Sequence, residues 1–376
     1  MIGFCGALDF EKRAVRFSVL KKMCGLHSSG CAFVNREFGI LCDGSIRIPD
    51  CDIQPVTVSY NNSLYTAAVI APAIVREDGS NMARSVLEGY FEEGEEFLHR
   101  LDFPYALALY DARCGELMLA KGHTGDKGLF YTVKDGTLYF ASALRPLFRL
   151  YGGCVRVSKK ALARHVTGGY SSIPTDLFCD IRILKPAHSL ICSCFGQSCV
   201  PTACSSYIGT GRTNQERISP IQAKKADVRY ILNQALFAFD YPQFDCYMPY
   251  LLPSLEEYRK KGEHTVYISD AISCDCKEYS AERADRLGNV WGLDVYFLSD
   301  DKDTPSSREL KKMEKELDDI LSEYLSSSSC IIREFDRDGV IDIVKSEKST
   351  PLRIRKKGLL CQCAMWFDSF NLVLDE

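Results

Sequence analysis

The chain lacks three features, and each absence narrows what the protein can be. No apolar stretch approaches the ~20 residues that cross a bilayer, so no membrane association is expected. Basic residues are not in excess, since the net charge is -4, and no nucleic-acid partner is expected. Acidic side chains at Asp9 and Glu11 come too early for a signal peptide, which favours a cytoplasmic protein. The short basic run Lys356-Lys357 is interpreted as a solvated helix face.

Cysteine, by contrast, is abundant, with 18 among 376 residues. None forms a C-x-x-C pair, and in a chain with no secretory leader most are expected to be reduced, buried thiols that pack like small apolar residues. The tightest cluster contains Cys192, Cys194, Cys199 and Cys204. Four thiolates can surround a zinc ion, but this spacing matches no familiar zinc motif. Packing is therefore the preferred interpretation, zinc is the alternative, and no metal is predicted.

The first part of the chain, residues 1–205, has the pattern of a β-rich domain. Lys134-Asp135-Gly136-Thr137 predicts a hairpin turn between two of its strands. Apolar residues at helical spacing predict a helix over 82–98. Strands are predicted over 103–110, 116–120, 129–133 and 138–142.

A polar stretch at 209–214 is interpreted as a linker to a second domain, residues 215–376. Two strands, 265–268 and 293–298, flank a predicted helix over 279–287, an order that favours a parallel α/β unit. The remaining predicted helices cover 221–239, 307–324 and 359–370.

Residues 79–148 contain a distinctive series of motifs. These are YFEEGEEFL (90–98), FPYALALY (103–110), LAKGHTGDKGLFY (119–131) and LYFASAL (138–144). In order and spacing the series resembles the glutaminase domain of glutamine-dependent asparagine synthetases. Weaker matches follow at DIRILKPAH (180–188), KEYSAERADRLG (277–288) and LLCQCAMWFD (359–368). The resemblance implies an α/β fold: an N-terminal α/β/β/α Ntn-type glutaminase sandwich, followed by a truncated α/β domain like the PP-loop ATPases.

The resemblance also locates the glutaminase nucleophile, and this chain departs from the family there. Family members begin Met-Cys-Gly; the Met is removed, and the Cys supplies both the attacking thiolate and a basic amine. Here Gly3 and Phe4 keep the register, but Ile2 replaces the Cys and carries no nucleophile. An alternative register uses Cys5 as the nucleophile after removal of residues 1–4. A thiol inside an apolar strand is, however, usually part of a core.

The family's supporting residues are missing as well. The tract expected to form the oxyanion hole, 71–75, lacks the Asn-Gly pair, and Pro72 has no backbone N–H. The tract expected to bind the substrate amine, 79–83, has no acid. The family's Gly-rich ATP loop corresponds to 245–254, which has no glycine and contains Pro249 and Pro253. ATP and Mg, which the family would use, are therefore not predicted as cofactors.

Three hypotheses for function follow. The preferred one is a catalytically degenerate relative that acts through a homodimer or through an active synthetase partner. The second is a working glutamine-dependent synthetase or amidotransferase with rearranged residues such as Cys5. The third is a small-molecule sensor that reuses one of the pockets in which the family binds its substrates.

Overall fold

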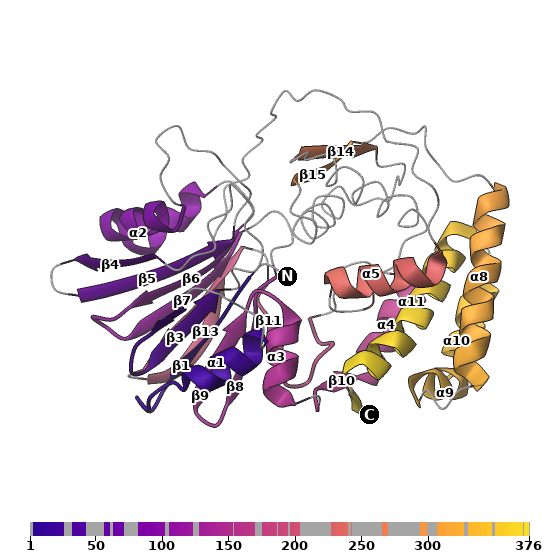
Figure 1. Ribbon diagram of the computed structural model, residues 1–376, viewed down its shortest axis with the longest axis horizontal. Coiled ribbons are helices and arrows are strands. Elements are labelled where there is room, and N and C mark those ends of the chain that lie inside the picture. The colour runs from indigo at the N-terminus through magenta and orange to yellow at the C-terminus, as the bar shows by residue number, and fades with distance from the viewer. Residues whose placement is uncertain are drawn as a thin grey trace. The chain divides into compact units, whose positions relative to one another are not determined.

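The computed structural model contains two compact units, shown in Figure 1. The first comprises Met1–Tyr151, Ile181–Glu216 and Ala281–Asp285, and the second comprises Gly152–Asp180, Arg217–Ser280 and Arg286–Glu376. The structure describes residues 3–25, 32–42, 56–60, 63–70, 82–101, 105–122, 128–152, 154–169, 175–185, 187–194, 196–203, 227–239, 242, 265–269, 294–298, 307–326, 330–347, 350–370 and 372–375.

The first unit contains two antiparallel sheets. In one, the strand order is β11-β8-β9-β1-β3-β2, which places β1 inside the sheet, between β9 and β3. Its strands are β1 (Phe4–Asp9), β2 (Ala32–Val34), β3 (Phe38–Cys42), β8 (Phe130–Lys134), β9 (Thr137–Ala141) and β11 (Arg182–Ile183). The other sheet has the order β13-β12-β7-β6-β5-β4. Its strands are β4 (Val56–Tyr60), β5 (Ser63–Ile70), β6 (Ala106–Asp111), β7 (Glu116–Lys121), β12 (His188–Ser193) and β13 (Gly196–Ala203).

The core of this unit lies between the two sheets. Alternate residues of each strand face it, such as Phe4 and Leu8 from β1 and Ala108 and Tyr110 from β6. On the outer face of the first sheet lie α1 (Phe17–Cys24) and α3 (Leu144–Tyr151). On the outer face of the second lies α2 (Met82–Glu93) with a 3-10 turn, η1 (Gly94–Arg100). The predicted α/β/β/α layering is confirmed.

Most predicted elements of this unit are present, with one correction. The hairpin turn is confirmed, because Asp135 and Gly136 both have positive φ, as a type I′ turn requires. The helix predicted over 82–98 instead ends at Glu93, because Gly94 adopts a φ of 65° and begins a tighter turn.

The second unit is mainly helical. Two strand pairs accompany the helices, and both are parallel: β10 (Arg156–Ser158) with β16 (Val373–Asp375), and β14 (Thr265–Ser269) with β15 (Asp294–Leu298). The helices described here are α4 (Lys159–Gly168), α5 (Val228–Phe239), α8 (Ser307–Ser326), α9 (Cys330–Arg337), α10 (Val340–Ser346) and α11 (Thr350–Phe370). The β14–β15 pair agrees with the predicted parallel unit, whereas 279–287 and the linker at 209–214 lie outside the described residues.

Two predictions about the closing helix need correction. The closing helix starts at Thr350, nine positions before the predicted 359, and Lys356 and Lys357 on it are buried instead of solvated. The segment Gly152–Asp180, placed within 1–205 by the predicted domain boundary, belongs to the second unit. The reason is that β10 pairs with β16 and α4 packs against α10 and α11.

Within the described part of the chain, no helix combines the length and apolar character that crossing a bilayer requires.

Candidate functional site

The start of β1 is where the sequence places the glutaminase nucleophile. Ser142, directly after β9, holds this end of the strand. The Phe4 N–H donates to Ser142 Oγ over 3.0 Å, and the Ser142 N–H donates to the Phe4 carbonyl over 2.9 Å. The next residue, Cys5, pairs with Leu41 on one side and Ala141 on the other. The strand is therefore fixed on both sides from its first residues. Ile2 lies outside the described residues.

The Cys5 side chain is fully buried, with 0% exposure. Phe4 and Leu8 point into the core between the sheets, so Cys5 points to the opposite face, which α1 covers. There its Sγ lies 3.4 Å from Sγ of Cys24, the last residue of α1. A thiol enclosed between a sheet and a helix cannot reach a substrate without rearrangement of the strand. This placement agrees with a core role for Cys5.

The opposite end of β1 carries a polar feature that sequence reasoning missed. The buried Asp9 carboxylate accepts hydrogen bonds from the Glu11 and Arg13 N–H groups, both over 2.9 Å. It also accepts from Arg13 Nε over 3.0 Å and from Thr137 Oγ1 over 2.8 Å. Burial raises the pKa of Asp9, but the bonds from Arg13 and Thr137 outweigh it, and the pKa is lowered below 3.8. An Asp at a strand end followed four residues later by Arg was the available signal.

Beside Asp9 lies an open cavity of about 560 Å³. Its wall combines apolar side chains with Asp9, Arg13 and Tyr139. The Arg13 guanidinium already has partners within the chain, because it forms an ion pair with Asp9 at 3.0 Å and donates to the Asp135 carbonyl. Asp9 and Arg13 therefore hold the β1–α1 connection to the hairpin between β8 and β9.

The candidate zinc cluster is only partly within the described residues. Cys192 and Cys194 belong to the core between the sheets, and burial raises the pKa of Cys194. Cys204 and the side chain of Cys199 lie outside the description. Among the residues that are described, no group of three or more His, Cys, Asp or Glu side chains could hold a metal ion. The placement of Cys192 and Cys194 supports the packing interpretation for those two residues.

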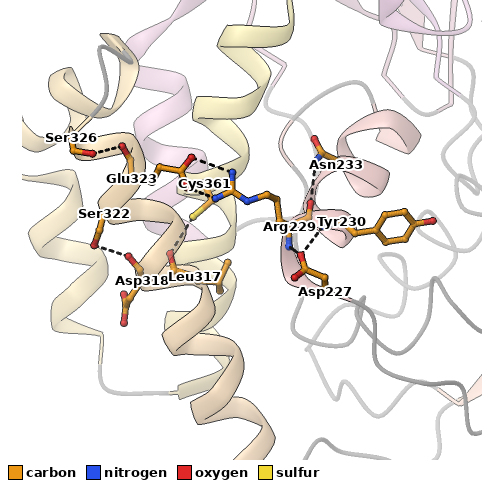
Figure 2. Close-up of polar contacts among 10 residues, drawn as sticks. All are labelled: Asp227, Arg229, Tyr230, Asn233, Leu317, Asp318, Ser322, Glu323, Ser326 and Cys361. Carbon is orange, nitrogen blue, oxygen red and sulfur yellow. Dashed lines mark hydrogen bonds and ion pairs between the residues drawn. The ribbon is translucent and has the colours of Figure 1, made fainter.

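In the second unit some polar contacts join helices, as Figure 2 shows for α5 with α8 and for α8 with α11. Arg229 of α5 forms an ion pair with Glu323 of α8. The Cys361 thiol of α11 donates to the Leu317 carbonyl of α8 over 3.6 Å, and full burial raises the pKa of this thiol to about 12. These contacts serve packing. The tracts matched to the oxyanion hole (71–75) and the ATP loop (245–254) lie outside the described residues. So do residues 79–81 of the amine-binding tract (79–83), whose last two positions begin α2.

Comparison with known proteins places the resemblance in a range that belongs mostly to the first unit and includes Gly152–Asp180 of the second. Residues 76–201 match the family described as glutamine amidotransferase domain. Asparagine synthetase [glutamine-hydrolyzing] 3 of Bacillus subtilis (strain 168) is 27% identical over 140 residues, which are 36% of this chain and 23% of that protein. The chain thus spans less than a quarter of the length of this relative.

Two solved structures align over 82% of this chain, each at 10% sequence identity and a TM-score of 0.36. One is the allosteric regulatory enzyme of purine biosynthesis, aligned over 69% of its chain. The other is glutamine phosphoribosylpyrophosphate amidotransferase from B. subtilis, solved with ADP and GMP and aligned over 70% of its chain.

Proposed function

We propose that this chain, an asparagine synthetase-like relative of the class II glutamine amidotransferases, has lost glutamine hydrolysis and acts through binding. The family match over 76–201 and the Bacillus relative confirm the relationship that the sequence motifs predicted. The loss of activity is our inference from the residues at the nucleophile position.

A single observation carries this proposal. The family position for the attacking thiol holds Ile2, and the nearest cysteine along the chain, Cys5, is buried at 0% exposure under α1. An N-terminal nucleophile needs a thiol and an amine that both reach the substrate. Cys5 instead has neighbours on both sides within the sheet, Leu41 and Ala141. Releasing it would require breaking the backbone pairing at the start of β1.

The sequence supports the same proposal for the second half. Where the family has a Gly-rich pyrophosphate loop, this chain has Pro249 and Pro253, each without a backbone N–H to donate to phosphate. We therefore propose that neither ATP nor Mg is a cofactor. A retained fold without either reaction leaves binding as the role, with a second copy of the chain or an active synthetase as the partner. Sedimentation of the chain alone and with an active synthetase tests these two partners.

Ammonia release from glutamine tests the central claim. We expect none from the wild type, and none at a family-like rate from Ile2→Cys. The new Cys would supply a thiol and an amine, yet one missing oxyanion donor alone typically costs ~10²–10³ in rate. The tract at 71–75 lacks the family's Asn-Gly pair. Isothermal calorimetry should likewise detect no micromolar binding of ATP, which corresponds to about −8 kcal/mol.

Two outcomes would overturn the proposal. Wild-type activity that disappears in Cys5→Ala but persists in Cys192→Ala would make Cys5 the nucleophile. Cys192 is the matched control because it is equally buried in a strand of the same unit. Family-like activity in Ile2→Cys would show that the supporting residues are supplied from elsewhere in the chain.

A further inference from the structure

The two thiols of Cys5 and Cys24 form a close pair with no role in the function proposed above. Their Sγ atoms are 3.4 Å apart, although the residues lie 19 positions apart in the chain. One belongs to a strand and the other to the last turn of the helix that covers it. A disulfide has an S–S length of about 2.05 Å, so the sulfurs need to approach by about 1.4 Å. A displacement of that size is within the reach of side-chain rotation.

The backbone holds both cysteines in place for this reaction. Cys5 lies in the sheet between Leu41 and Ala141. Cys24 is held by Arg149 of α3, whose Nη1 donates to the Cys24 carbonyl over 2.6 Å and to the Met23 carbonyl over 3.1 Å. Thiols that are held close together need little chain ordering to form a bond, which favours the intramolecular step.

The two thiols differ in access to solvent. Cys5 is fully buried, whereas Cys24 is partly exposed. Thiol–disulfide exchange begins with a thiolate that can reach the other reactant. An external oxidant must therefore meet Cys24 first, and Cys5 must complete the bond from inside.

We propose that Cys5 and Cys24 form a reversible disulfide when the chain meets a small-molecule disulfide such as oxidised glutathione. The Cys24 thiolate attacks one sulfur of the oxidant, which forms a mixed disulfide and releases one glutathione thiolate. The Cys5 thiolate then attacks the Cys24 sulfur, and the second glutathione leaves. Two protein thiols are oxidised and one glutathione disulfide is reduced to two thiols, which take up the two protons. The product ties the start of β1 to the end of α1.

Tryptic mapping of the full chain tests the bond. The folded protein is incubated with oxidised glutathione, blocked with iodoacetamide and digested without reduction. Cys5 is the only cysteine of the tryptic peptide 1–12, and Cys24 lies in the peptide 23–36. We expect these two peptides to be joined, and dithiothreitol added before blocking to separate them. The joined form should also melt several degrees above the reduced form, because the bond restricts the unfolded chain.

Variants identify the two sulfurs. Peptide 23–36 also contains Cys31, so Cys31→Ser is the matched control and should keep the joined peptides. Cys24→Ser and Cys5→Ala should each abolish both the joined peptides and the rise in melting temperature. Absence of the joined peptides in wild type while other cysteines become glutathionylated would overturn the proposal. Joined peptides that persist in Cys24→Ser but vanish in Cys31→Ser would overturn it as well. Glutamine hydrolysis enters neither readout, so failure here leaves the proposed function standing.

Discussion

The first unit uses its charged side chains to close turns, whereas the second uses them to join helices. Arg13 pairs with Asp9 four residues before it, and Arg113 pairs with Asp111 two residues before it. In the second unit Lys357 of α11 reaches Glu314 of α8 at 2.8 Å, and α4 and α9 are joined by another such ion pair, Lys159 with Glu334.

The contrast follows from how strands and helices satisfy the hydrogen bonding of their backbone N–H and C=O groups. The N–H and C=O groups of a strand form hydrogen bonds with neighbouring strands, so this ladder of backbone bonds connects distant parts of the chain. A helix satisfies those groups internally, so connections between helices depend on side chains. In the first unit the ladders therefore already connect distant parts of the chain, while in the second unit polar pairs add such connections between helices.

Removing a core side chain of the first unit should have the largest effect. Phe140 is fully buried, and its ring packs edge-on against the ring of Phe4, with 6.2 Å between the ring centroids. We expect Phe140→Ala to lower the free energy of unfolding by about 4 kcal/mol, through lost burial and a cavity. Urea denaturation followed by far-UV circular dichroism measures it. Val133→Ala, at a side chain 53% exposed on the same sheet, should change little. Equal effects of the two variants would contradict a dominant core.

Breaking the polar pairs of the second unit should come next. Glu314 binds Lys357 and also Arg353, whose Nε lies 2.6 Å away, and its side chain is 15% exposed. Glu314→Gln removes the carboxylate that Arg353 and Lys357 share, although Lys357 keeps Asp318, and we expect the free energy of unfolding to fall by about 3 kcal/mol. Tryptophan fluorescence during urea denaturation reports it, because the buried Trp366 lies on α11, the helix that also carries Arg353 and Lys357.

The matched control is Glu323→Gln, on the same helix. Its side chain is 61% exposed where it pairs with Arg229 (Figure 2), so the expected loss is below about 1 kcal/mol. If Glu314→Gln were as mild as this control, the second unit would not depend on its buried pairs.

The third prediction, with a smaller expected effect than Phe140→Ala or Glu314→Gln, concerns the turn after β1. Asp9→Asn removes a charged acceptor of several hydrogen bonds, and we expect a loss of about 2 kcal/mol at pH 7. The folded pKa of Asp9 is lowered, so its stabilisation is present above the ordinary value of 3.8 and is lost as the pH falls through the folded pKa. The gap between wild type and variant should therefore narrow in acid. Melting curves at pH 7 and near pH 3 test this, and a gap that widens in acid would contradict it.

Sequence patterns predicted the first unit well and the second less well, for physical reasons. Strand composition and the Asp135-Gly136 turn are local signals, and the turn and the strands β6 to β9 were confirmed. The break at Gly94 was missed because the apolar spacing continues through it to Phe97. The early start of α11 was missed because Lys356 and Lys357 read as solvent-facing. Their acidic partners, such as Glu314 and Glu347, are contributed by other parts of the chain.

The candidate site shows the same limit. The replacement at Ile2 and a core role for Cys5 could be read from the sequence. The neighbour of Cys5 could not, because nothing in the sequence singles out Cys24 among the other cysteines as its partner. That contact depends on the placement of α1 on the sheet, which only the fold provides.

The parallel pairing of β10 with β16 has a consequence for how the chain is made. Arg156 on β10 meets Val373 on β16, so a ribosome must add more than two hundred residues before the first strand meets its partner. At a synthesis rate of about 5–20 residues per second, β10 waits on the order of ten seconds or more. During that time the apolar face of α4, with Leu162 and Val166, also lacks the helix α11 that later packs against it. A chaperone that binds apolar surface therefore has time to meet this segment during synthesis.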